Sequence, residues 1–220
     1  KGILHKDRTD LQDPTNYKHE LIYDANPEQL QGDCGIALEG ADVLISASIP
    51  GPGVIRKEWI SKMADDAVVF ALANPIPEIF PWEAIEAGAR IVATGRSDFP
   101  NQVNNSLCFP GIFRGTLDVR ARTITDEMCI AASYALANLI DEIEGGLTES
   151  SILPTMDCEE VFIKQAVAVG LKAIDQGLAL LNLSEEEILL NSQKIIDESQ
   201  AQFKILMQKG FIPSFDDYEK

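Results

Sequence analysis

Three short apolar runs, each ending in a loop rich in Gly, Pro or Asn, constrain the fold of this chain most strongly. They span residues 42–46, 67–73 and 90–94. The segments between them, 55–63 and 77–88, have the apolar spacing of short helices. Runs that are apolar on both faces suit a parallel sheet, and strand–helix–strand repeats at this spacing imply right-handed crossovers. The sequence therefore predicts an α/β fold with a doubly wound parallel sheet.

The rest of the chain is predicted to be mainly helical, with an irregular first stretch of about 35 residues that contains a short helix over 27–34. Ser184 and the three glutamates after it have the pattern of a capping box, which begins the last helix. We expect the helices at about 105–117, 125–145, 158–176 and 184–210.

These elements predict two domains. Residues 1–182 form a dinucleotide-binding, Rossmann-like domain, and residues 183–220 form a helical extension. The apolar stripe of the extension needs a surface to cover, because an amphipathic helix buries one face. That surface belongs either to its own domain or to a second subunit.

The charge and the cysteine content limit the partners and the compartment. With 35 acidic and 18 basic residues the net charge is −17, which argues against nucleic acid and anionic membrane surfaces as partners. No apolar run approaches the length of a membrane span, and the first residues do not form a signal peptide. The four cysteines are far apart, which indicates reduced thiols and a cytoplasmic protein.

Small polar groups follow each predicted strand, at the edge where open α/β sheets bind ligands. They are Ser46-Ala47-Ser48, Asn74, and the loop that carries Asn101, Asn104 and Asn105. Amide groups donate and accept hydrogen bonds but supply no proton at neutral pH, so they indicate a binding surface rather than an acid–base centre. Two structural explanations stay open: Asn74 as a turn opener before proline, and Asn104 or Asn105 as a helix cap.

Three stretches, 70–75, 91–105 and 109–115, resemble the NAD-binding domain of bacterial malic enzymes. Residues 41–51 and 124–128 fit the same family, and the resemblance covers about residues 1–180. This family oxidatively decarboxylates malate to pyruvate and CO₂ with NAD or NADP and Mg²⁺ or Mn²⁺. The resemblance implies that Asn74 and Asn104 contact malate and the nicotinamide end of the cofactor, with Asn105 beside them. Residues Ser46, Ala47 and Ser48 would lie along the dinucleotide.

The catalytic Tyr and Lys, the acidic metal ligands and the glycine-rich dinucleotide turn of the family have no counterpart among these residues. The resemblance therefore implies the C-terminal half of a malic enzyme, with the first βαβ unit of its Rossmann-like sheet truncated. We expect no catalytic residue and no metal ligand in this chain, and no activity from the chain alone. The complete protein is expected to be a homo-oligomer, a dimer, that binds malate and pyruvate.

Two other functions stay open. The chain could be an inactive fragment that serves as a binding or oligomerisation module. It could also be the cofactor domain of another NAD-dependent hydroxy-acid dehydrogenase, although the asparagine-rich loop argues against this. A G-x-G-x-x-G turn and an Asp-Asp metal motif upstream of this sequence would favour the malic enzyme.

Overall fold

The computed structural model describes residues 2–143 and 145–213, and they form two compact units. Unit 1 contains the described residues up to Val103 together with Thr148–Ser151, and unit 2 contains Asn104–Leu147 and the described residues from Ile152 onward. The predicted domain boundary at residue 182 lies inside unit 2. The division of the chain into two domains at that residue stays a prediction. Lys1 and the end of the predicted extension, 214–220, lie outside the described residues.

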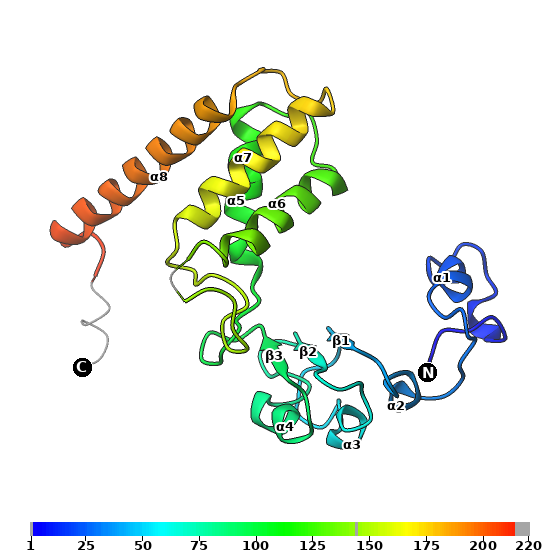
Figure 1. Ribbon diagram of the computed structural model, residues 1–220. Helices are drawn as coiled ribbons and strands as arrows, with labels where there is room; N and C mark the ends of the chain where they lie inside the picture. The colour runs from blue at the N-terminus through cyan, green and yellow to red at the C-terminus, as the bar shows by residue number, and fades with distance from the viewer. Residues whose placement is uncertain (1, 144, 214–220) are drawn as a thin grey trace. The chain divides into compact units, whose positions relative to one another are not determined.

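Unit 1 is built on a parallel three-stranded sheet in the order β1-β2-β3. The strands are β1 (Val43–Ser46), β2 (Val68–Ala71) and β3 (Ile91–Thr94), which confirms the predicted α/β fold. The connecting helices α3 (Lys57–Ile60) and α4 (Pro81–Glu86) lie on the same face of the sheet (Figure 1). Both are shorter than the sequence predicts, because turns replace their expected ends.

The core of unit 1 lies between the sheet and these two helices. Val69 and Ala71 of β2 have no exposed surface, and neither has Ala84 of α4. On β1 the burial alternates, so that Leu44 and Ser46 are buried while Val43 and Ile45 are exposed. The other buried apolar residues of this core are Leu38, Ile55, Ile60, Met63, Ala67, Ile79, Ala89 and Val92.

The first part of unit 1 differs from the prediction. The helices there are η1 (Thr9–Leu11), α1 (Lys18–Asp24) and α2 (Cys34–Ala37), and the helix expected over 27–34 is absent from the described structure. The side chain of Asn26 explains the difference. Its amide nitrogen donates to the carbonyls of Leu4 and Leu30, and its oxygen accepts from the Leu30 N–H, which fixes a loop instead.

Unit 2 is helical. Its elements are η2 (Asn105–Leu107), α5 (Phe109–Asp118), α6 (Asp126–Leu139), α7 (Glu160–Asp175) and α8 (Glu185–Gln208).

Side-chain caps begin two of these helices where the sequence predicts them. The Thr125 hydroxyl accepts from the Met128 N–H at the start of α6, and Ser184 and Glu187 form the predicted capping box of α8. The single helix expected over 105–117 is instead divided at Cys108, between η2 and α5.

Helices α5 and α7 approach closely because α5 presents glycines to α7. A Cβ atom at Gly111 would lie 2.6 Å from the Cβ of Gln165, and a Cβ at Gly115 would overlap the backbone carbonyl of Ala166. A backbone carbonyl cannot move aside as a flexible side chain can. Gly115 is therefore the point at which the helix spacing is fixed.

We expect Gly115→Ala to lower the free energy of unfolding by about 2 kcal/mol, because overpacking a helix contact outweighs the better helix propensity of alanine. Gly170→Ala in α7 is the matched control, since its nearest neighbours are movable side-chain ends, the Ile188 Cδ1 at 3.0 Å and the Val119 Cγ1 at 3.3 Å. Urea unfolding followed by circular dichroism measures both. If the two variants were equally stable, Gly115 would not be the point that fixes the spacing of α5 and α7.

Candidate functional site

The three strands of unit 1 end together. In the register of the sheet, Ser46 lies beside Ala71, and Ala71 lies beside Thr94. The loops that follow the strands therefore leave from one edge, which is the edge where parallel sheets bind ligands. Two polar side chains, those of Glu78 and Arg96, connect these loops.

The carboxylate of Glu78 joins the loop after β1 to the end of β2. It is fully buried. Its Oε1 accepts from the Ser46 hydroxyl at 2.7 Å, from the Ser48 N–H at 2.7 Å and from the Ser48 hydroxyl at 3.0 Å. Its Oε2 accepts from the Ala73 N–H at 3.0 Å, one residue before Asn74. One carboxylate thus positions two of the strand-end loops.

These hydrogen bonds also determine the ionisation of Glu78. Burial by itself would raise the pKa of the carboxyl group, since it removes the charge from water. The donors from Ser48, Ser46 and Ala73 outweigh burial, so the pKa of Glu78 lies below its ordinary value of 4.5. Glu78 is therefore a charged acceptor at neutral pH and not a proton donor.

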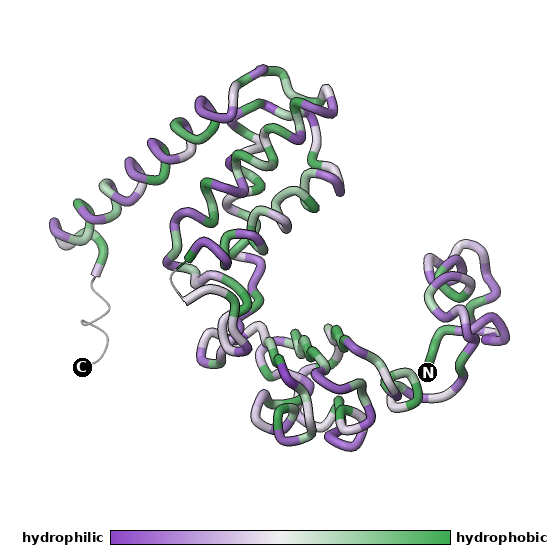
Figure 2. Tube along the Cα trace, in the orientation of Figure 1, coloured by the Kyte–Doolittle hydropathy of each residue, from purple (hydrophilic) through white to green (hydrophobic). Residues whose placement is uncertain are grey.

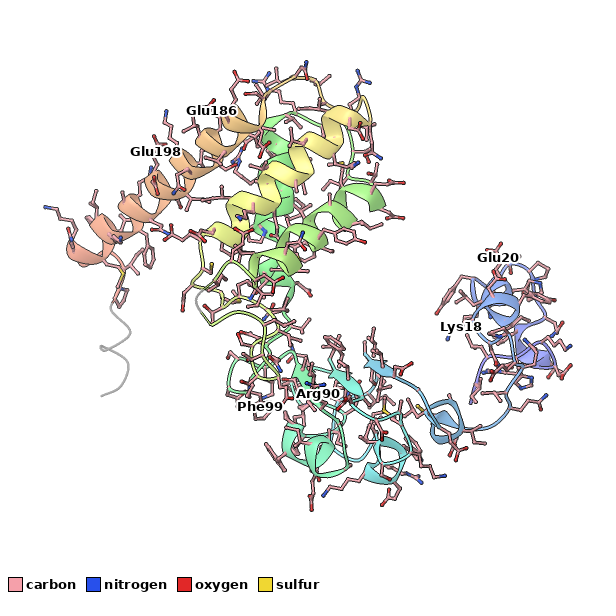
Figure 3. All side chains as sticks on the ribbon, in the orientation of Figure 1. Lys18, Glu20, Arg90, Phe99, Glu186 and Glu198 are labelled. Atoms are coloured by element: carbon pink, nitrogen blue, oxygen red, sulfur yellow. The ribbon has the colours of Figure 1, made fainter. Side chains whose placement is uncertain are left out.

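The side chain of Arg96 joins the loop after β3 to the loop after β2. Its Nη1 donates to the Pro75 carbonyl at 3.0 Å, while its Nε and Nη2 donate to the two carboxylate oxygens of Asp98 at 2.7 and 2.6 Å. The guanidinium also lies over the Phe99 ring, 5.1 Å from its centroid. Figure 3 labels Phe99 in this part of unit 1. The turn that carries Asn74 is thereby held on one side by the bond from Ala73 to Glu78 and on the other by the bond from Arg96 to Pro75.

The side-chain amide of Asn74 is free of hydrogen-bonding contacts within the described residues. Its side chain is exposed and makes no hydrogen bond within the described part of the chain. The peptide bond between Asn74 and Pro75 is cis. The side chain of a turn-opening asparagine normally forms a hydrogen bond with its own backbone. The amide of Asn74 forms none, so its donor and acceptor groups are available.

The asparagines of the loop after β3 have three different environments. Asn101 is buried, and its amide donates to the carbonyls of Val92 at 3.0 Å and Glu149 at 2.7 Å, which is a structural role. Asn104 is half-buried and accepts at Oδ1 from the N–H and the hydroxyl of Ser106. Asn104 is thus the N-cap of η2, one of the two explanations that the sequence leaves open. Asn105 is exposed.

The predicted site residues are divided between the two units. Ser46, Ala47, Ser48 and Asn74 belong to unit 1, where Glu78 brings the serines and the approach to Asn74 together. Asn104 and Asn105 belong to unit 2, at the start of its first helical turn. Sequence reasoning missed Glu78 and Arg96. The sequence did contain a signal for Glu78: in the stretch 77–79, an acidic residue stands between two apolar residues.

Hydroxyls, amides and backbone groups make these strand ends suited to binding polar ligands rather than to proton transfer. The described residues contain no group of three or more His, Cys, Asp or Glu side chains that could hold a metal ion. The amides suit the carboxamide, hydroxyl and carboxylate groups of a nucleotide cofactor and a small acid.

A parallel sheet with flanking helices, and with polar groups at the carboxyl edge, defines the class: a Rossmann-like nucleotide-binding α/β domain. The family described as "Malic enzyme, NAD binding domain" matches residues 1–174. The chain therefore belongs to the malic enzyme family, and its match is to the NAD-binding domain.

Named relatives agree with this. The chain is 46% identical over 178 residues to the NAD-dependent malic enzyme of Geobacillus stearothermophilus, covering 81% of this chain and 36% of that protein. It is 42% identical over 195 residues to the bifunctional malic/malolactic enzyme of Bacillus subtilis strain 168, covering 89% and 46%. The chain thus spans less than half the length of these relatives.

Solved structures confirm the fold. The malic enzyme of Entamoeba histolytica superposes with a TM-score of 0.91 at 45% identity, covering 97% of this chain and 44% of that one. The malic enzyme of Pyrococcus horikoshii gives a TM-score of 0.84 at 46% identity, covering 91% and 45%. No helix in the described residues combines the length and the apolarity needed to cross a bilayer.

Proposed function

We propose that this chain is the cofactor-binding part of an enzyme that oxidatively decarboxylates malate to pyruvate and CO₂ with NAD or NADP. The observation that carries the proposal is the free amide of Asn74 at the carboxyl edge of a parallel sheet, in a chain of the malic enzyme family. The complete protein would also use Mg²⁺ or Mn²⁺, which polarises a carbonyl during decarboxylation. Its ligands would come from the part of the relatives that this chain does not span.

The residues of this chain would bind and orient the reactants. In the proposal, Asn74 and Asn104 contact malate and the nicotinamide end of the cofactor, and Asn105 lies beside them. Ser46, Ala47 and Ser48 would line the dinucleotide. Both serine hydroxyls already donate to Glu78, so they would meet the cofactor through their oxygen lone pairs.

The geometry of the amides supports a role in orientation. The Oδ1 of Asn104 is engaged as a cap, while its NH₂ group keeps two donors for a carboxylate or a carboxamide oxygen. Asn74 offers both its donors and its acceptor. Such groups hold a substrate in place for hydride transfer, whereas the base that removes the hydroxyl proton would be supplied from outside this chain.

We expect the purified 220-residue chain to produce no pyruvate from malate and to bind NAD weakly or not at all. The physical reason is that the base and the metal ligands of the reaction are proposed to come from the part of the relatives that this chain does not span. Pyruvate formation with NAD and Mn²⁺ measures the activity, and calorimetric titration measures cofactor binding. Pyruvate formation by the chain alone would overturn this division of roles.

A chimera tests the proposed function directly. The segment of the Geobacillus stearothermophilus enzyme that aligns with this chain would be replaced by this chain, which is 46% identical to it. Malate-dependent reduction of NAD with formation of pyruvate would support the proposal. A folded chimera that reduces NAD with another hydroxy acid and not with malate would favour a different dehydrogenase.

Two further proposals concern the cellular location and the oligomeric state of the protein. We propose a cytoplasmic location, supported by the four free cysteines Cys34, Cys108, Cys129 and Cys158. We also propose a homo-oligomer, a dimer. An inactive binding or oligomerisation module is the alternative, and a folded chimera that binds NAD but leaves malate unchanged would favour it.

A further inference from the structure

The serines of the loop after β1 direct their protons into the chain. The Ser48 N–H and the Ser48 hydroxyl donate to the Oε1 of Glu78 at 2.7 and 3.0 Å, and the Ser46 hydroxyl donates to the same atom at 2.7 Å. The Ser46 oxygen also lies 3.4 Å from the Ser48 oxygen, but its single proton goes to the much shorter contact with Glu78. The side-chain protons of both serines are therefore already used.

Ser48 keeps an acceptor for a ligand. A hydroxyl carries one proton and two lone pairs, so a hydroxyl that donates can still accept. Ser48 is an exposed residue, whereas Ser46 is 8% exposed and Glu78 is fully buried. The Ser48 oxygen is thus the part of this group that a ligand at the strand ends can reach. A ligand group that binds it has to donate a hydrogen bond.

Glu78 is held in place and cannot turn away to release these protons. Its Oε2 accepts from the Ala73 N–H at 3.0 Å, and its backbone carbonyl accepts from the Ile55 N–H at 3.2 Å. The next residue, Ile79, is 1% exposed and anchors the segment in the core of unit 1. The orientation of the Ser48 hydroxyl is therefore built into the folded chain and is not set by the ligand.

The charge of Glu78 strengthens the acceptor. The carboxylate lies at the ends of β1 and β2, which Figure 2 shows as hydrophobic segments. In such surroundings a charge acts more strongly than in water. Hydrogen bonds in a chain polarise one another, so donation to a carboxylate makes the Ser48 oxygen a better acceptor. The same charge repels anions, and the loop after β1 therefore favours uncharged groups that donate.

The ribose hydroxyls are the groups of a dinucleotide that fit this acceptor. They are uncharged and each carries a proton to donate. The pyrophosphate is negatively charged and offers acceptors, so it does not suit a serine oxygen beside a buried carboxylate. The carboxamide of the nicotinamide also donates, but the proposed contacts of Asn74 and Asn104 cover that end of the cofactor.

We propose that Glu78 is a positioning residue for cofactor binding: it holds the protons of Ser46 and Ser48 inward, so that the Ser48 oxygen accepts a hydrogen bond from a ribose hydroxyl. Because Glu78 is fully buried, it acts through Ser48 and does not itself contact the cofactor. The inference rests on the proposed function and names the ligand group that the loop after β1 recognises.

Calorimetric titration of the active chimera with NAD and with fluorinated NAD analogues tests the proposal. In each analogue a single ribose hydroxyl is replaced by fluorine, which is small but cannot donate a hydrogen bond. We expect one analogue to bind about tenfold or more weakly than NAD, as the loss of a hydrogen bond to a charge-assisted acceptor would produce. In Ser48→Ala this discrimination disappears. In Glu78→Gln it shrinks, because an amide has a single oxygen for the serines and the Ala73 N–H.

Glu86→Gln is the matched control, since it makes the same chemical change at an exposed carboxylate of α4 and is expected to keep the full discrimination. Glu78→Gln and Ser48→Ala together are expected to weaken NAD binding by less than the product of their single effects, because both act on one contact. A merely structural Glu78 would instead weaken NAD and every analogue alike. Circular dichroism confirms that each variant is folded, and Ser48→Ala changes only an exposed side chain.

The outcomes separate this inference from the proposed function. If the chimera oxidises malate but binds NAD and all the analogues equally, or if Ser48→Ala keeps the discrimination, the ribose contact is overturned alone. If Ser48→Ala loses the discrimination and a folded Glu78→Gln keeps it in full, the positioning role of Glu78 is overturned. A folded chimera that binds no NAD overturns the inference together with the proposed function.

Discussion

Glu78→Ala is expected to lower the free energy of unfolding by about 4 kcal/mol, the sum of several lost charge-assisted hydrogen bonds in a buried site. The carboxylate accepts from both serines and from the Ala73 N–H, and the alternative contact between the two serine hydroxyls is long, at 3.4 Å. Ser46 and Ala73 are both buried, so water does not readily replace the carboxylate. The substitution therefore leaves unpaired polar groups between two strand ends.

The contribution of Glu78 is also expected to depend on pH. Its pKa is lower in the folded chain than in the unfolded chain, so a proton binds the unfolded chain more readily. The stabilisation is complete above the ordinary value of 4.5 and is lost as the pH falls through the folded-state pKa. The stability difference between the unsubstituted chain and Glu78→Gln should therefore shrink as the pH falls below that value.

Urea unfolding at neutral pH and at a series of acidic pH values measures both effects. Glu86→Ala is the matched control, because Glu86 lies in the nearby helix α4 but is exposed and pairs only with Lys57 in the described structure. Its unfolding midpoint should stay close to that of the unsubstituted chain. If Glu78→Ala behaves like Glu86→Ala, Glu78 does not hold the strand ends together.

The sheet was predictable from the sequence because each of its strands can be recognised from neighbouring residues alone. Each strand is an apolar run bounded by turn residues, and the runs at 43–46, 68–71 and 91–94 need no distant partner to be recognised. The capping box at Ser184 is local in the same sense. The loop around Asn26 was not predictable, because it depends on a hydrogen bond to Leu4, which is distant in the sequence. The break at Cys108 has a local signal that was overlooked, since Pro110 lies in the first turn of α5, where proline is typical of a helix start.

The candidate site was predictable as a set of residue types but not as a set of contacts. Asn74 was recognised because it follows a strand. Nothing local distinguishes it from Asn101, which the structure shows to be buried and bonded to the carbonyl of Glu149, 48 residues away. The pairing of Ser46 with Glu78 spans 32 residues and was missed for the same reason.

Asn104→Ala, made in the active chimera, is expected to raise the KM for malate or lower kcat by about one to three orders of magnitude, as the loss of a buried polar contact would. The structure adds a complication, since Asn104 also caps η2 through its Oδ1. A loss of activity in the alanine variant alone could therefore come from a frayed helix start.

Asn104→Asp separates the two roles. An aspartate keeps an oxygen that accepts from the Ser106 N–H and hydroxyl, so the cap survives, but it loses the NH₂ donors and adds a charge that repels malate. If Asn104 binds the substrate, the aspartate variant loses as much activity as the alanine variant while unfolding at the same urea concentration as the parent chimera. If Asn104 only caps the helix, the aspartate variant retains activity. Asn191→Ala, at an exposed position of α8, is the control for which we expect unchanged kinetics.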